Sequence, residues 1–210
     1  MSEQRTLPEF LEALGSSAPT PGGGAASALA AALAAALAEM VARLTAGRAR
    51  YQEVDAAMRA VIEKAAALRA QLLVLIEEDE QAYAGVSAAF RLPKTTDDES
   101  VQRDAAVQVA LVAAMQPPLR VMQRACDVLD LAVEVAASGN VSVVSDAGCA
   151  ALLGEAAVRA AGLNVQANVV LLRDEAVAAQ AREAMVKLEE RATALREHAM
   201  ASVHARMQRS

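Results

Sequence analysis

One carboxylate stands out among the residues that could do chemistry, because it falls on the apolar face of a predicted helix. Asp79 lies four residues after Leu75 and four before Tyr83, and this spacing puts it on the same helix face as those side chains. A carboxylate on an apolar face must be paired, hydrogen-bonded or shifted in pKa. Asp79 is therefore a candidate general acid or base. A structural aspartate that pairs with an arginine or a helix N-terminus would show the same pattern.

A second candidate site is the loop Pro19-Thr20-Pro21-Gly22-Gly23-Gly24, which leads into a helix rich in Ala and Leu. Backbone N–H groups in the first turn of a helix lack intrahelical partners and lie at the positive end of the helix dipole. Because glycines allow a ligand to approach these groups, the loop can hold a carboxylate or a phosphate. The spacing matches neither common nucleotide-binding glycine motif, and a tight turn that only allows close helix packing is an equally good interpretation.

Four further polar residues occupy positions where they could contact a ligand. Lys94 follows a proline in the loop after a long helix, where it could bind a substrate carboxylate or simply be solvated. Asp146, Asn164 and Asn168 fall on the buried face of a later helix. Asp146 and Asn164 are roughly 27 Å apart along an unbroken helix, so they would serve different ends of a long ligand, or different sites that meet at a subunit interface. The alternatives are a helix-dipole charge for Asp146 and interhelical hydrogen bonds for the two asparagines.

Helices must position all these side chains. Apolar residues recur at helical spacing along most of the chain, two capping boxes begin helices, and no segment has a convincing strand pattern. The expected helices span Leu7–Leu14, Ala25–Thr45, Tyr51–Phe90, Thr96–Met115, Pro118–Gly139, Ser145–Leu172 and Arg173–Arg206. The second of these is apolar on nearly every face, so it is expected to be buried and to end near Gly47. The sequence predicts an all-α protein with a single domain over residues 1–210, a bundle of long antiparallel helices around a buried Ala-rich helix.

Composition argues against several classes of partner. The 210 residues are 55% hydrophobic with a net charge of −6, which provides an ample core but no basic face for nucleic acid. Cys126 and Cys149 have neither metal-ligand nor disulfide spacing, and we expect buried, reduced thiols in a cytoplasmic protein. Residues 1–14 lack the apolar core of a signal peptide. The Ala-rich helix is too weakly apolar for a membrane span and is closed by Glu39 and Arg43. We expect no nucleic-acid, membrane or metal partner.

Taken together, the motifs resemble the formiminotransferase-cyclodeaminase family, specifically its cyclodeaminase domain and the stand-alone bacterial methenyltetrahydrofolate cyclohydrolases. The order and spacing match from about Leu7 to the last helix, although Ala25 stands where the family often has serine and Tyr83 where it often has phenylalanine. The matching runs are Pro19-Thr20-Pro21-Gly22-Gly23-Gly24, Glu78-Asp79, Ala89-Phe90-Arg91-Leu92-Pro93-Lys94, Gly139-Asn140, Ser145-Asp146-Ala147-Gly148 and Asn164 with Asn168.

The resemblance implies an all-α homodimer whose substrate is a tetrahydrofolate with a one-carbon unit between N5 and N10. It implies metal-free acid/base chemistry at the bridging carbon without a cofactor, as a 5-formiminotetrahydrofolate cyclodeaminase or a 5,10-methenyltetrahydrofolate cyclohydrolase. Asp79 would be the main acid/base, with Asp146 in support. The expected substrate-binding residues are Gly22, Gly23, Gly24, Arg91, Lys94, Asn164 and Asn168. The alternative is a non-catalytic helical folate-binding or scaffold protein, although a pure scaffold would not need Asp79 on an inward face.

Overall fold

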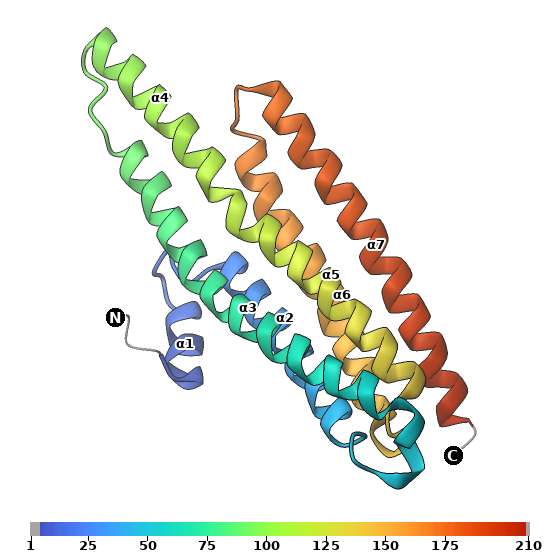
Figure 1. Ribbon diagram of the computed structural model, residues 1–210. Helices are drawn as coiled ribbons and strands as arrows, with labels where there is room; N and C mark the ends of the chain where they lie inside the picture. The colour runs from blue at the N-terminus through green and yellow to red at the C-terminus, as the bar shows by residue number, and fades with distance from the viewer. Residues whose placement is uncertain (1–4, 209–210) are drawn as a thin grey trace.

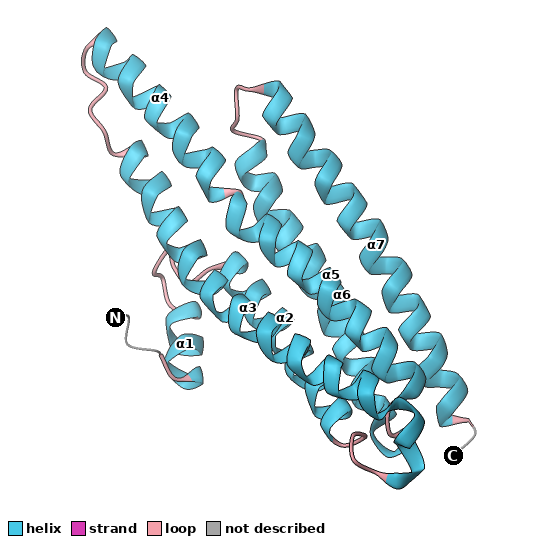
Figure 2. Cartoon of the chain, in the orientation of Figure 1, coloured by secondary structure: helices cyan, strands magenta, loops and turns pink. Residues whose placement is uncertain are grey.

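The computed structural model describes residues 5–208, which form a bundle of α-helices with no strand in that range (Figures 1 and 2). The α-helices are α1 (Leu7–Leu14), α2 (Gly23–Arg43), α3 (Asp55–Phe90), α4 (Asp97–Ala114), α5 (Gln116–Ser138), α6 (Val144–Val169) and α7 (Glu175–Met207). Two short 3-10 turns, Ala49–Val54 and Val141–Val143, connect α2 to α3 and α5 to α6. This architecture confirms the predicted fold class; residues 1–4 and 209–210 of the predicted domain lie outside the described range.

Helix α2 lies at the centre of the bundle, as its composition predicts. It packs against α3, α5 and α6, and alanines such as Ala28, Ala31 and Ala35 are fully buried. Because each of these side chains is one methyl group, the neighbouring backbones can approach closely. The predicted end near Gly47 is wrong: α2 ends at Arg43. Gly47 instead turns the following loop, with a φ of 76°.

Helix α3 begins four residues later than predicted, because Tyr51 has a non-helical backbone within the 3-10 turn. Its hydroxyl accepts a hydrogen bond from the Val141 N–H (3.1 Å) and lies 3.3 Å from Asn140 Oδ1. The Asn140 backbone N–H donates to Thr45 Oγ1, and its side-chain amide donates to the Leu44 carbonyl. The Gly139-Asn140 motif thus holds together the α2–α3 and α5–α6 connections at one end of the bundle.

Three helical stretches within residues 5–208 are long and apolar enough to cross a membrane by length and composition alone: Gly23–Arg43, Asp97–Ser138 and Val141–Val169, with mean hydropathies of 1.8, 1.2 and 1.5. The expectation that the Ala-rich helix is too weakly apolar to span a membrane is therefore wrong by length and composition. In the most apolar window of Gly23–Arg43, 61% is buried inside the protein. Packing within the bundle uses much of its apolar surface, and the absence of a membrane partner stays a prediction.

Candidate active site

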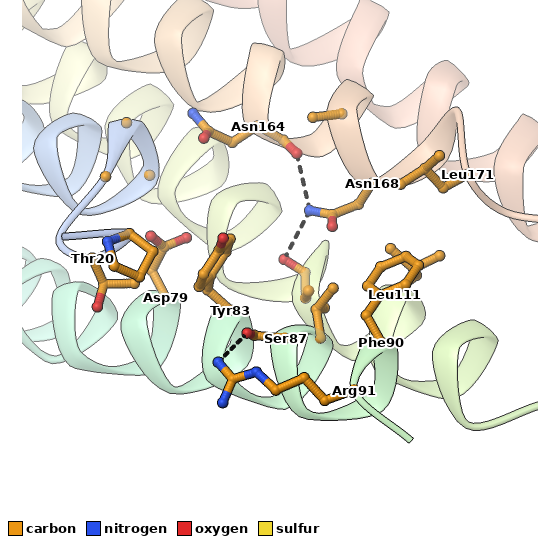
Figure 3. A pocket seen from close by; sticks show the side chains of 17 residues that line it. Thr20, Asp79, Tyr83, Ser87, Phe90, Arg91, Leu111, Asn164, Asn168 and Leu171 are labelled. Atoms are coloured by element: carbon orange, nitrogen blue, oxygen red, sulfur yellow. Dashed lines mark hydrogen bonds between the residues drawn. The ribbon is translucent and has the colours of Figure 1, made fainter. Parts of the chain in front are cut away.

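A cavity of about 630 Å³ opens beside the N-terminus of α2, the second half of α3, the end of α4 and the end of α6 (Figure 3). It brings together side chains that are far apart in the sequence. The predicted site residues that line it are Gly22, Gly23, Gly24, Asp79, Arg91, Asn164 and Asn168. The glycine loop and Asp79 therefore belong to one site, although the sequence indicated each of them separately.

The Asp79 carboxyl group lies directly against the first turn of α2. A Cβ atom on Gly24 would lie only 2.5 Å from Asp79 Cγ, so only glycine leaves room for the carboxylate at this point. The Ala25 backbone N–H hydrogen-bonds to the carboxylate, as expected where first-turn donors lack intrahelical partners. The glycine thus permits a close approach between α2 and α3 at the site itself.

Burial raises the pKa of Asp79 above its ordinary value. The hydrogen bond from the Ala25 N–H lowers this pKa, and the nearby Glu80 charge raises it, but loss of solvation is the largest cause. No arginine or lysine is among the groups that shift it. Asp79 is therefore not neutralised by an arginine, which was one structural alternative. The other alternative, contact with a helix N-terminus, is observed. A half-buried carboxylate with a raised pKa is suited to proton transfer.

Two asparagines on α6 form the opposite wall of the cavity. A Cβ on Gly23 would be 3.2 Å from Asn164 Nδ2, so Asn164 faces the glycine loop. Asn164 Nδ2 donates to the Ala160 carbonyl at 2.9 Å, and Asn168 Nδ2 donates to the carbonyls of Asn164 (3.0 Å) and Ala114 (3.4 Å). Because these bonds use both amide hydrogens of Asn168, its Oδ1 is left as an acceptor.

Two aromatic residues line the cavity instead of the core. Tyr83 and Phe90 fall on the apolar stripe predicted for α3, yet they are 47% and 43% exposed. The part of this stripe that follows Leu75 in the sequence faces the cavity and not the core. The chain has only two Tyr and two Phe residues, so one of each on the same predicted helix face as Asp79 is a usable signal in the sequence. At the edge of the cavity, Arg91 donates a hydrogen bond of 2.7 Å to Ser87 Oγ.

Other lining residues had no signal in the sequence. Leu111 on α4 and Leu171 after α6 close one end of the cavity. Their positions follow from how α4 and α6 pack, and nothing in their local sequence distinguishes them from core leucines.

Two predicted site residues do not line the cavity. Lys94 is exposed in the loop between α3 and α4, where its carbonyl accepts a hydrogen bond from Ser100 Oγ. Asp146 lies in the first turn of α6, at the end of that helix opposite Asn164 and near the Asn140 connection. Within one chain the structure therefore does not bring Asp146 to Asp79. No group of three His, Cys, Asp or Glu side chains in residues 5–208 is placed to hold a metal ion.

Comparisons with known proteins identify the family. The formiminotransferase-cyclodeaminase family model matches residues 6–187. A methenyltetrahydrofolate cyclohydrolase from Methylorubrum extorquens is 42% identical over 207 residues, which cover 99% of this chain and 100% of that protein. The formimidoyltransferase-cyclodeaminase of Rattus norvegicus is 33% identical over 170 residues, 81% of this chain but 31% of that larger protein. The crystal structure of formiminotetrahydrofolate cyclodeaminase from Thermotoga maritima superposes with a TM-score of 0.87 at 27% identity, over 96% of this chain and 97% of that one. The chain therefore belongs to the formiminotransferase-cyclodeaminase family.

Proposed function

We propose that this protein is a tetrahydrofolate one-carbon enzyme, acting as a 5,10-methenyltetrahydrofolate cyclohydrolase or a 5-formiminotetrahydrofolate cyclodeaminase. The observation that supports this most directly is the Asp79 carboxyl group, which has a raised pKa and lies in a cavity of substrate size. The relative that matches at 42% identity over its whole length is a cyclohydrolase, so the hydrolytic reaction is the first to assay.

Both reactions need a proton acceptor beside the same carbon atom. In the cyclohydrolase reaction, water attacks the bridging carbon of the methenyl cation while Asp79 takes a proton from it. The tetrahedral carbinol then collapses: one carbon–nitrogen bond breaks, Asp79 returns its proton to the departing nitrogen, and the hydroxyl group releases its remaining proton to solvent as the formyl C=O forms. In the cyclodeaminase reaction, N10 attacks the formimino carbon, a base removes the N10 proton and ammonia leaves after protonation. A carboxyl group with a raised pKa can act in both directions, and we propose that neither reaction uses a metal or a cofactor.

The remaining polar lining offers contacts for the rest of a folate. Asn168 Oδ1 and the Asn164 amide can accept hydrogen bonds from the N–H groups of the pterin ring, while the glycine loop presents backbone N–H groups. Arg91, which Ser87 orients, can bind a carboxylate of the glutamate tail. Lys94 lies in the loop that follows Arg91, beyond the edge of the cavity. We propose that it binds the far end of the glutamate tail.

The decisive experiment is to assay the purified protein with both folates and to follow the absorbance of the methenyl form. Turnover of 5,10-methenyltetrahydrofolate or of 5-formiminotetrahydrofolate identifies the reaction. Folate binding without turnover of either compound would support the non-catalytic binding protein instead. If neither folate binds, the proposed function is wrong.

We also propose that the protein is a homodimer and acts in the cytoplasm. Large apolar side chains on α1, α2 and α3 are exposed, and contiguous exposed apolar surface marks interaction sites. The exposed residues are Leu7 (56%), Leu11 (53%), Leu33 (49%), Leu73 (43%) and Val74 (55%). Leu7 and Leu73 line the same surface groove. Both cysteines are unpaired, which is compatible with a reducing compartment; Cys126 is buried as expected, but Cys149 is exposed.

Light scattering at micromolar concentration should give the mass of two chains. Leu73→Glu places a charge in the apolar groove that Leu7 and Leu73 line and should shift the protein towards monomer. Val186→Glu is the matched control, since Val186 is 53% exposed on α7, and it should leave the mass unchanged. A wild-type protein that is entirely monomeric would contradict the dimer proposal.

Gly23→Ala tests whether the glycine loop binds substrate. The added methyl group would lie 3.2–3.3 Å from the Asn164 amide atoms, so this amide must shift by a few tenths of an ångström. We expect KM for the folate to rise by about threefold to tenfold, with less than a twofold change in turnover number, because ground-state contacts rather than the reacting group are disturbed. Steady-state kinetics measure both values. An unchanged KM in a folded variant would make the loop purely structural.

A further inference from the structure

The end of the cavity away from Asp79 contains an aromatic ring with a cation behind it. Phe90, the last residue of α3, lines the cavity. The guanidinium carbon of Arg103, on α4, lies 5.5 Å from the centroid of the Phe90 ring. Arg103 Nε also donates a hydrogen bond of 3.2 Å to the Phe90 carbonyl. One arginine, whose side chain is only 20% exposed, therefore fixes both the ring and the backbone of Phe90.

This arrangement leaves part of the Phe90 ring available to a ligand. The residue is 43% exposed although Arg103 contacts its ring. Leu111 and Leu171 lie at the same end of the cavity (Figure 3), so two apolar side chains border the ring on the cavity side. Asp79 and Phe90 are roughly 16 Å apart along the axis of α3. The cavity thus has a proton-transfer group at one end and an aromatic slot at the other.

We propose that Phe90, held in place by Arg103, is the stacking platform for the aminobenzoyl ring of the folate, the flat ring that leads from the N5–N10 bridge towards the glutamate tail. This inference rests on the proposed function. Folates carry two flat ring systems, the pterin and the aminobenzoyl group, on either side of the N5–N10 bridge, and both are rich in electrons because they bear amino nitrogens. A cation on one face of an aromatic ring draws electron density towards itself. The opposite face of Phe90 therefore becomes a better partner for an electron-rich ring.

Arg103 is a positioning residue in this arrangement, because it acts through Phe90. A purely structural role must be distinguished from it. The last carbonyls of a helix lack intrahelical partners and attract cations, so Arg103 could do no more than stabilise the end of α3. In that case its removal would lower the melting temperature but leave ligand affinity unchanged.

A double-mutant cycle on ligand affinity separates the two roles. The measured quantity is the Kd of 5-formyltetrahydrofolate, a stable folate, for the wild type, Phe90→Leu, Arg103→Met and the double variant. Phe90→Leu should raise Kd by about tenfold, a typical effect of losing one stacked ring, and Arg103→Met by about threefold. The double variant should match Phe90→Leu alone, because Arg103 has no effect once the ring is absent. Phe90→Tyr should retain wild-type affinity.

Two further measurements sharpen the result. The chain contains no tryptophan, so Phe90→Trp places a single tryptophan on the platform, and folate binding should quench its fluorescence. N-(4-aminobenzoyl)glutamate and 6-methyltetrahydropterin each carry one of the two ring systems, and only the first should lose affinity in Phe90→Leu. Arg182→Met is the control for loss of a positive charge, because Arg182 is an exposed residue on α7 that pairs with Glu175, and it should leave Kd unchanged.

The outcomes are distinct. If the wild type does not bind 5-formyltetrahydrofolate, the proposed function fails. If the wild type binds but Phe90→Leu binds equally well, or N-(4-aminobenzoyl)glutamate keeps its affinity for that variant, the platform is overturned while the function stands. Multiplicative effects of the two substitutions would show that Arg103 contacts the ligand directly, and a changed melting temperature with an unchanged Kd would show that it only caps α3. Either result would overturn the positioning role.

Discussion

Asp79→Asn should lower the turnover number by roughly 10²–10⁴-fold, the usual contribution of a positioned general acid or base. Asparagine keeps the shape of the side chain but cannot take a proton from water or N10. Because the cavity wall is otherwise unchanged, Kd for 5-formyltetrahydrofolate should stay within a few-fold of the wild-type value. Steady-state kinetics and a binding titration measure these quantities. Near-wild-type turnover in a folded Asp79→Asn variant would contradict the assignment.

The stability of Asp79→Asn can also be predicted, and measuring it distinguishes a loss of catalysis from a loss of folding. The pKa of Asp79 is raised in the folded state, so the folded protein binds this proton more tightly than the unfolded chain does. The resulting stabilisation is present below the ordinary pKa of aspartate and is lost as the pH rises through the raised pKa. Asparagine remains neutral at every pH. The melting temperature of Asp79→Asn should therefore equal or exceed that of the wild type at neutral pH, and the difference should shrink in acid.

The second large effect is expected from Gly24→Ala. The new methyl group would overlap the Asp79 carboxyl group, since its carbon would lie 2.5 Å from Asp79 Cγ. Either the carboxylate leaves its place beside the Ala25 N–H or the first turn of α2 moves away from α3. A displacement of about 1 Å in a catalytic group can cost about 10²-fold in rate, so we expect the turnover number to fall by at least about that factor.

Gly85→Ala is the matched control for this substitution. Gly85 lies on α3, and a Cβ there meets no atom within 4 Å. Its replacement should leave turnover unchanged and stabilise the protein by about 0.5–1 kcal/mol, because alanine is the better residue inside a helix. Circular dichroism and thermal unfolding establish that both variants fold. Wild-type turnover in a folded Gly24→Ala variant would show that the contact with Asp79 has no role in catalysis.

The sequence predicts well those features that depend on neighbours along the chain. The helical phase of Asp79 identifies an inward-facing carboxylate, and the alanines of α2 predict a buried central helix. The glycine run is correctly placed at a helix N-terminus, but α2 begins at Gly23 and not at Ala25, so Gly23 and Gly24 belong to its first turn and not to the loop. Local pattern does not show that Asp79 and Gly24 touch, because that contact depends on how closely α2 and α3 pack.

Other features depend on tertiary packing and could not be predicted. Helical periodicity puts Tyr83 and Phe90 on the inner face of α3, but it does not distinguish a face that meets the core from one that meets a cavity. The Gly139-Asn140 motif is indistinguishable in sequence from a ligand-binding motif, although Asn140 ties two connections together. Lys94 and Asp146 have suitable chemistry, yet their helices and loops place them outside the cavity.

The cavity walls come from segments that are far apart in the chain, from the start of α2 to the end of α6, and the walls therefore form at different stages of folding. The hairpin of α2 and α3 contains neighbouring parts of the sequence and can form early, because closing a short loop costs little entropy. The wall that contains Asn164 and Asn168 is in place only after the chain has returned through α4, α5 and α6. During refolding, the helical signal should therefore recover before catalytic activity does, and a fragment that stops short of α6 would lack a complete site.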